Sequence, residues 1–111
     1  MTNEPSHSPR AIVEHMLEND PFSRWMSIKL LDVSKGTCRL KCEIRKEMHN
    51  GFSVTHGGIL FSLADSAIAF AAATYGRVSL AVDHSISFIH KTEAGRVLTA
   101  KAETISMGNK M

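Results

Sequence analysis

The sequence has few cysteines, few aromatic residues and no large excess of either charge. Only 2 of its 111 residues are cysteine, and 6% are aromatic. Lys and Arg number 13 against 11 Asp and Glu, a formal net charge of +2 that does not support a dedicated nucleic-acid-binding protein. The length allows a single domain with one modest core. No secretory signal pattern is present, so we expect a cytoplasmic protein.

The two cysteines, Cys38 and Cys42, are four residues apart in an alternating stretch. On a strand their Cα atoms would lie about 13 Å apart, beyond the roughly 7 Å limit for a disulfide. A zinc site would need further ligands at finger-like spacing, which the neighbouring sequence lacks. We therefore expect two small buried apolar side chains in a reducing compartment, and no metal site.

The amino-terminal part predicts a short amphipathic helix followed by a hairpin. Ser8 suits an N-cap and Pro9 a first helical position, so a helix is expected over about residues 9–19, ended by Pro21. Trp25 is expected to be a packing anchor rather than a binding surface. Period-two alternation on both sides of a turn at 34–36 predicts two strands with one buried face. The residues expected on that face are Met26, Ile28, Leu30, Cys38, Leu40, Cys42 and Ile44.

The central run from Ile59 to Tyr75 has 13 apolar residues in 17, six of them alanine, and Asp65 is its only charge. A membrane span needs about 20 apolar residues, so this run is too short to be one. It predicts one helix that is hydrophobic nearly all round and is therefore wrapped by other structure. Gly76 suits its C-cap.

Two further strands are expected, over about 78–90 and 97–105, with a turn at 91–95 between them. One face of the first carries Val78, Leu80, Val82, His84, Ile86, Phe88 and His90. The short turns predict antiparallel pairing. The sequence as a whole predicts an α+β fold, with a single antiparallel sheet curled around one buried helix.

Gly57 and Gly58 stand at the start of the central helix, where the first backbone N–H groups have no intrahelical partner. Such a helix end favours an anion or a developing oxyanion. The alternative is an ordinary tight turn into a helix.

A narrow polar strip on the same helix consists of Ser62, Asp65 and Ser66. A carboxylate in this position is either satisfied by neighbouring hydroxyls or solvent, or it serves as a general base or nucleophile in a partly dry cleft. From Gly58 to Asp65 the helix rises about 10 Å. One chain cannot easily place both on one reacting group, so we expect a dimer whose two sites each use two subunits.

The pattern Asn50…His56-Gly57-Gly58…Asp65, the run Phe61-Ser62-Leu63-Ala64-Asp65-Ser66-Ala67 and the closing Gly76 resemble the hotdog-fold acyl-CoA thioesterases. The similarity is greatest to the phenylacetic-acid-degradation (PaaI-type) branch and covers most of the chain. It implies a long helix wrapped by an antiparallel sheet, assembled into homodimers and often homotetramers. It also implies hydrolysis of an aromatic or medium-chain acyl-CoA to the free acid and CoA, without a metal or redox cofactor.

The resemblance also assigns roles to residues. Asp65 matches the catalytic carboxylate, acting as nucleophile or as base for a water. Gly57 matches the residue whose backbone N–H polarises the thioester carbonyl, and Asn50 and His56 match those that position the water and the thioester. The expected substrate contacts are Gly58, Ser66, His90 and Lys91, the last two beside the CoA phosphates or in a solvated turn.

The chain departs from the family pattern in three respects, one of which is His90-Lys91 in place of the Arg-Pro pair that relatives often have after the strand. Ala81 and its neighbours stand where some relatives carry a serine or threonine that assists catalysis. Relatives also continue with about two more strands, so residues 1–111 are expected to form one hotdog domain that is incomplete at its carboxyl end. Alone, such a domain should be poorly stable or inactive. The alternative function is an acyl-CoA-binding module without hydrolysis, and a hotdog dehydratase fits the His/Asp arrangement less well.

Overall fold

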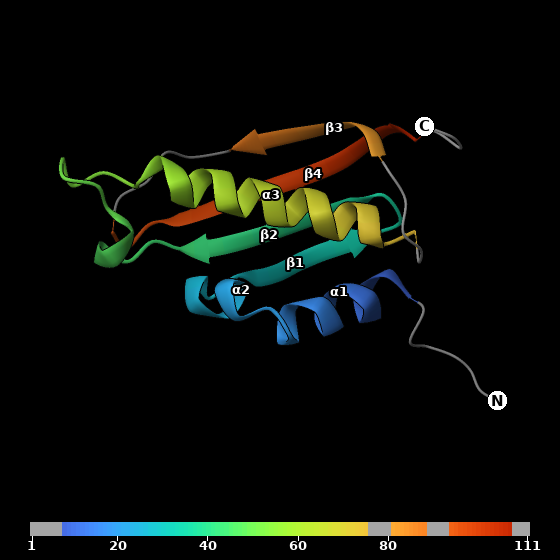
Figure 1. Ribbon diagram of the computed structural model, residues 1–111, viewed down its shortest axis with the longest axis horizontal. Coiled ribbons are helices and arrows are strands. Elements are labelled where there is room, and N and C mark those ends of the chain that lie inside the picture. Colours follow the sequence, from blue (N-terminus) through green and yellow to red (C-terminus); the bar gives the residue numbers. More distant parts are fainter. Residues whose placement is uncertain (1–7, 76–80, 89–93, 108–111) are drawn as a thin grey trace.

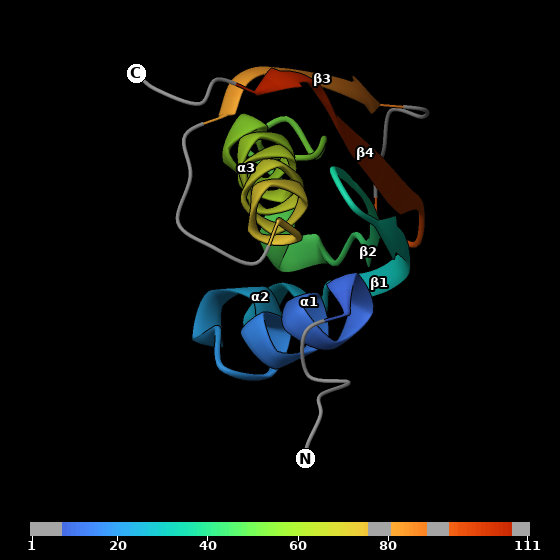
Figure 2. The ribbon, with the colours of Figure 1, turned by 90° about the vertical axis from the view of Figure 1, so that its right-hand side faces the viewer.

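The computed structural model describes residues 8–75, 81–88 and 94–107, with side chains described outside 81–88 and 105–107. Its four strands form one antiparallel sheet in the order β1-β2-β4-β3, and the sheet curves around the long helix α3 (Figures 1 and 2). This confirms the predicted α+β class. The elements in chain order are α1 (Pro9–Glu18), α2 (Pro21–Met26), β1 (Lys29–Ser34), β2 (Thr37–Glu43), the 3-10 turn η2 (Lys46–Met48), α3 (Gly57–Ala73), β3 (Ala81–Phe88) and β4 (Val97–Met107).

Helix α1 begins where the sequence predicts, because the Ser8 hydroxyl accepts a hydrogen bond from the Ala11 N–H at 3.1 Å. Helix α2 was not predicted. The Asp20 carboxylate accepts hydrogen bonds from two N–H groups of the next turn, and Pro21 occupies the first helical position. The predicted strand beginning at Met26 is therefore wrong in its start. The Asp20 cap and Pro21 favour a helix more strongly than the alternation of Met26, Ile28 and Leu30 favours a strand. As a result, α2 ends at Met26 and β1 begins at Lys29.

The inner face of β2 follows the predicted alternation, with Cys38, Leu40 and Cys42 all buried. Both cysteines are free thiols, as expected. Burial, with a smaller effect of the nearby Asp32 carboxylate, raises the pKa of Cys38 to about 12. Burial also raises the pKa of Cys42, whose Sγ donates to the Met26 carbonyl at 3.1 Å. At neutral pH both side chains are protonated and behave as small apolar groups.

Helix α3 packs into the curve of the sheet against β2 and β4, as the end-on view in Figure 2 shows. Its inner stripe is buried against a strand face of small side chains, Ala100 and Ala102, which allows the helix to approach closely. The buried residues of the helix are Ile59, Leu63, Ala67, Phe70 and Ala71.

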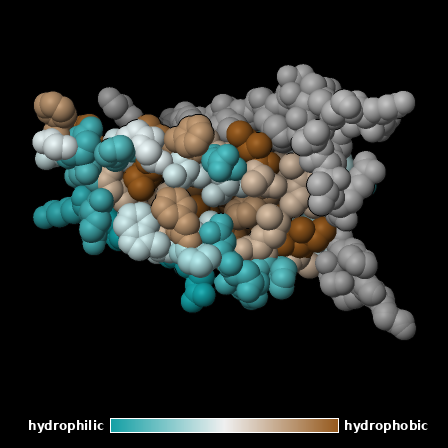
Figure 3. Space-filling view, viewed as in Figure 1, coloured by the Kyte–Doolittle hydropathy of each residue, from teal (hydrophilic) through white to brown (hydrophobic). Residues whose placement is uncertain are grey.

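The opposite stripe of α3 remains exposed, which differs from the predicted all-round burial. Phe61 is 71% exposed, and Asp65 and Ala69 are exposed at successive turns. Among the described residues, the sheet and α1 pack against this helix, but they leave the stripe of Phe61, Asp65 and Ala69 uncovered. Figure 3 shows apolar residues gathered over α3 on this face, bordered by hydrophilic ones.

The carboxyl end of α3 is tied to the β1–β2 turn. The Thr74 hydroxyl accepts a hydrogen bond from the Gly36 N–H at 2.7 Å and donates to the Ala71 carbonyl at 2.6 Å. Gly36 has φ of +85°, and a Cβ there would lie 2.6 Å from the Tyr75 hydroxyl oxygen, so this turn requires glycine. Thr74 occupies the C-cap position, and Gly76, predicted for that role, lies outside the described residues.

Strand β3 covers the central part of the segment predicted over 78–90, and β4 extends two residues beyond the predicted 105. The pairing register between β3 and β4 shifts twice between Ala81 and His84. The single regular alternation predicted for β3 is therefore interrupted there. Val78, Leu80 and His90 lie outside the described residues.

We expect Thr74→Val to lower the free energy of unfolding by about 1–3 kcal/mol, because valine has a similar shape but leaves the Gly36 N–H without its acceptor. Urea unfolding followed by circular dichroism measures the change. Ser34→Ala, which removes an exposed hydroxyl pair with Thr37, is the matched control, with an expected effect below about 0.5 kcal/mol. Equal effects of the two substitutions would show that Thr74 does not couple the turn to the helix.

Candidate functional site

The loop before α3 is closed by the side chain of Asn50. The Asn50 Oδ1 atom accepts hydrogen bonds from the N–H groups of Phe52 at 2.8 Å and Val54 at 3.4 Å. The Asn50 N–H donates to the Val54 carbonyl at 2.8 Å, and the His56 N–H donates to the Met48 carbonyl at 2.7 Å. These bonds make the loop a small hairpin whose end delivers the chain into α3.

His56 is the N-cap of α3, and its Nδ1 accepts a hydrogen bond from the Gly58 N–H at 2.8 Å. The prediction that the first N–H groups are all open to a ligand is therefore wrong for Gly58. Because Nδ1 is an acceptor, the neutral imidazole carries its proton on Nε2, which is then a donor. Gly57 is exposed, and no described atom lies within 4 Å of where a Cβ would stand. A ligand can approach the backbone at Gly57 closely.

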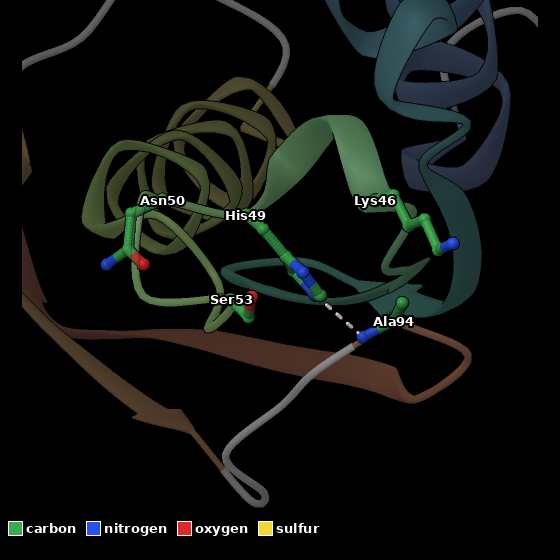
Figure 4. A pocket seen from close by; sticks show the side chains of 5 residues that line it. All are labelled: Lys46, His49, Asn50, Ser53 and Ala94. Atoms are coloured by element: carbon green, nitrogen blue, oxygen red, sulfur yellow. Dashed lines mark hydrogen bonds between the residues drawn. The ribbon is translucent and has the colours of Figure 1, made fainter.

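The larger of two cavities beside this loop has a volume of about 600 Å³ and a polar lining (Figure 4). His49 projects into it between Lys46 and Asn50, and its Nε2 accepts a hydrogen bond from the Ala94 N–H at 2.8 Å. That bond connects the loop to the turn before β4. The lining residues are Lys46, His49, Asn50, Ser53 and Ala94.

The smaller cavity, about 320 Å³, lies between α2 and the start of α3 and shares His49 with the first. Phe22 and Trp25 form its α2 side and are 47% and 48% exposed. Trp25, which we expected to be a packing anchor rather than a binding surface, thus lines a cavity with about half of its surface exposed. The lining residues are Phe22, Trp25, Glu47, Met48, His49, His56, Gly58, Ile59 and Ser62.

The structure separates the candidate catalytic residues within one chain. Asn50 lines the larger cavity and His56 the smaller, while Asp65 lines neither of these two cavities and is exposed. Gly57 and Asp65 are eight residues apart on α3, a rise of about 12 Å. These positions agree with the spacing that led us to expect a second subunit.

The candidate substrate contacts are also dispersed. Gly58 lines the smaller cavity, and Ser66 is half-buried on α3, outside both cavities. His90 and Lys91 lie outside the described residues.

Sequence reasoning missed Lys46 and His49 in the larger cavity and the pair Phe22 and Trp25 in the smaller. The pair was detectable, because Asp20 followed by proline is a helix-start signal that would have placed the two rings three residues apart on one helix. Nothing local signals His49, since its backbone partner is 45 residues away.

Neither a metal centre nor a membrane span is found in the part of the chain that the structure describes. Its His, Cys, Asp and Glu side chains form no group of three or more that could hold a metal ion. No described helix is both long enough and apolar enough to cross a bilayer.

Comparison with known proteins places this chain in one family. The family model described as "Thioesterase superfamily" matches residues 52–111. A "Putative esterase" of Archaeoglobus fulgidus is 32% identical over 109 residues, covering 98% of this chain and 71% of that protein. The "Acyl-coenzyme A thioesterase PaaI" of Escherichia coli is 33% identical over 103 residues, covering 93% and 74%.

Solved structures agree with these matches. The structure of E. coli PaaI, from the phenylacetic acid degradation operon, superposes with a TM-score of 0.81 at 32% identity, covering 96% of this chain and 77% of that one. The TT0310 protein of Thermus thermophilus gives 0.70 at 30% identity, covering 82% and 77%. The chain belongs to the thioesterase superfamily. Within it, the chain is a hotdog protein of the PaaI type and a thioester hydrolase.

We expect Asn50→Ala to lower the free energy of unfolding by about 1 kcal/mol, because the Phe52 and Val54 N–H groups lose their shared acceptor. Asn50→Asp keeps an acceptor oxygen and should stay within about 0.5 kcal/mol of the original chain. Urea unfolding gives the energies, and amide hydrogen exchange at Phe52 and Val54 reports on the loop itself. Unchanged exchange in Asn50→Ala would contradict this role.

Proposed function

We propose that the protein hydrolyses an acyl-CoA thioester, with an aromatic or medium-length acyl group, to the carboxylic acid and CoA. The observation that supports this most directly is the start of α3, where an approachable backbone at Gly57 stands between His56 and Gly58, which both line the smaller cavity. The name of the E. coli relative, an acyl-coenzyme A thioesterase, supports the same substrate class.

In the proposed reaction, the thioester carbonyl oxygen lies against the Gly57 N–H, where the helix dipole stabilises the developing negative charge. The Nε2–H of His56 is a second donor at the same end of the helix. Asp65 either takes a proton from a water or attacks the carbonyl carbon itself, and Asn50 with His56 positions the water and the thioester. In the first route the water oxygen bonds to the acyl carbon, the C–S bond breaks, and the CoA sulfur leaves with the proton that Asp65 took from the water. In the second route an Asp65 oxygen bonds to the acyl carbon as the C–S bond breaks, and a water then cleaves the acyl–Asp65 anhydride, which restores the carboxylate and supplies the proton to the CoA sulfur.

We assign Asp65 to the site of a second copy of the chain. The exposed stripe of α3 carries Asp65 between Phe61 and Ala69, a mostly apolar surface that a homodimer would cover. Pairing two copies through this face brings the Asp65 of one towards the helix start of the other. The same residues then serve two symmetric sites, and a tetramer would pair two such dimers.

The remaining substrate contacts are proposed for the CoA moiety and the thioester group. Gly58 and Ser66 lie on α3 near the proposed path of the thioester, and His90 and Lys91 are assigned to the CoA phosphates. Lys46 adds a cation to the larger cavity, whose polar lining suits the pantetheine or phosphate part of CoA. The described elements share one core, which supports treating residues 1–111 as one hotdog domain.

A second candidate is an acyl-CoA-binding module that does not hydrolyse its ligand. The observation that favours it is the position of Asp65, which in the single chain is exposed and outside both cavities. Binding without thiol release distinguishes this candidate from the enzyme.

We expect Asp65→Asn to lower turnover of phenylacetyl-CoA by at least about 100-fold, because the amide can serve neither as base nor as nucleophile. Thiol release from a panel of acyl-CoA esters, followed with a thiol reagent, measures turnover. The buried thiols Cys38 and Cys42 should not interfere, since burial raises the pKa of both. Binding of a non-hydrolysable thioether analogue should change less than about twofold.

Asp32→Asn is the matched control, because Asp32 is an exposed carboxylate on β1 that pairs with Arg39. It should leave turnover unchanged. Unchanged turnover in Asp65→Asn would remove Asp65 from the mechanism. If the unsubstituted protein binds the analogue but releases no thiol from any ester, it is the acyl-CoA-binding module instead.

We further expect that mixing the inactive variants His56→Ala and Asp65→Asn restores about a quarter of the original activity. Random pairing makes half of the dimers mixed, and each mixed dimer contains one site with both residues intact. Co-expression with two affinity tags isolates the mixed species, and each variant paired with itself is the control. No recovery in the isolated mixed dimer would place both residues in the site of a single chain.

A further inference from the structure

Two large aromatic side chains on α2 are held side by side at the surface. The rings of Phe22 and Trp25 are stacked, with centroids 6.0 Å apart and planes 19° from parallel. Each remains about half exposed, although Met26 on the same short helix is completely buried. Burial of an aromatic side chain is favourable, so this pair retains apolar surface that a ligand can cover.

Trp25 is fixed in place by Arg45. The guanidinium carbon lies 4.8 Å from the centroid of the indole ring, and the same guanidinium donates a hydrogen bond to the Trp25 carbonyl at 2.8 Å. The Glu47 Oε1 atom lies 3.8 Å from Nε of the same guanidinium. A ring held this way loses little conformational freedom when a ligand binds, which is a property of a preorganised binding surface.

The pair faces the start of α3 across the 320 Å³ cavity. A cavity of about 150 Å³ is enough for a benzene ring, so this one has room for an aryl ring and a short linker. On its α3 side the cavity is lined by Gly58, Ile59 and Ser62, which belong to the helix residues that follow Gly57 in the sequence. With the carbonyl at Gly57, an acyl group that turns into this cavity meets the two rings.

The other strongly exposed phenylalanines do not offer this arrangement. Phe52 is 87% exposed in the loop and Phe61 is 71% exposed on the outer stripe of α3, and neither lines the cavity. Only Phe22 and Trp25, among the described aromatic residues, combine exposure with a position on the wall of a cavity at the helix start.

We propose that Phe22 and Trp25 form the wall of the acyl-group subsite and make flat aryl rings preferred over short acyl chains. This inference rests on the proposed thioesterase function and adds the residues that determine its specificity. An aryl ring stacks on the pair and covers surface that an acetyl group is too small to reach.

The kinetic test compares kcat/KM for phenylacetyl-CoA and acetyl-CoA. Trp25→Ala should lower the value for phenylacetyl-CoA by about 10–100-fold, while the value for acetyl-CoA changes less than about twofold. Trp25→Phe should retain most of the preference, because it keeps a flat ring. Leu31→Ala, which truncates another exposed apolar side chain on β1 away from the cavity, should leave both values unchanged.

A binding test uses the original chain and so does not depend on the folding of any variant. Trp25 is the single tryptophan of the sequence, which makes intrinsic fluorescence a direct probe of this wall. The thioether S-phenacyl-CoA should shift or quench the emission as it binds, and CoA alone should not. Competitive inhibition or calorimetry establishes that the analogue is bound.

The outcomes separate the two proposals. An unchanged phenylacetyl to acetyl ratio in folded Trp25→Ala, or unchanged fluorescence with bound S-phenacyl-CoA, overturns the subsite while leaving the thioesterase intact. A change in oligomeric state without a change in the ratio also overturns it, because the rings then contact a second copy. Fluorescence that responds to S-phenacyl-CoA in a chain that releases no thiol supports the subsite and refutes the hydrolase.

Discussion

The position of α3 in the curve of the sheet determines most other features of this protein. Its inner stripe packs against the small side chains of β4, while hydrogen bonds hold both of its ends. Thr74 connects one end to the β1–β2 turn, and the Met48 carbonyl connects the other to the loop through the His56 N–H. Because these contacts prevent the helix from sliding or rotating, its first turn stands in a defined place beside the smaller cavity.

His56 contributes to structure and to the proposed chemistry through different atoms of one ring. Nδ1 accepts from the Gly58 N–H and caps the helix, so the neutral ring presents Nε2–H as a donor. The capping bond thus selects the tautomer that the proposed carbonyl-binding role requires.

The parts of the fold that local chemistry determines were predictable from the sequence. The Ser8 cap, the alternation of Cys38, Leu40 and Cys42, and the long apolar helix all follow from side-chain type and spacing. Helix α2 shows the limit of pattern matching, because alternation extended the predicted strand back to Met26, a residue that the Asp-Pro helix start places in α2. The register of β2 against β4 had no local signal, since it depends on how the sheet closes over α3.

The candidate site was predictable in part for the same reason. Asn50, His56 and Gly57 lie in one short segment, so their spacing alone identified them. His49 lines a cavity while bonded to a residue 45 positions away in the chain, a contact that no local pattern contains. Trp25 was detectable, because the Asp20-Pro21 start places it on a short helix with Phe22. The exposure of Asp65 was not predictable from its apolar neighbours, because burial of that stripe requires a surface that the chain's own sheet does not provide.

The proposed dimer explains two observations together: the candidate catalytic residues lie apart within one chain, and the outer stripe of α3 is exposed. In an isologous antiparallel pairing of two helices, residues that face each other lie at equal distances from the two-fold axis. Bringing Gly57 of one copy to Asp65 of the other therefore puts the axis at the residue midway between them, which is Phe61. That residue is the most exposed large hydrophobic side chain on the helix, at 71%. The position that sequence spacing assigns to the axis is thus the position where the structure exposes an aromatic ring, and an apolar residue at the axis can pack on its own symmetry mate without a charge clash.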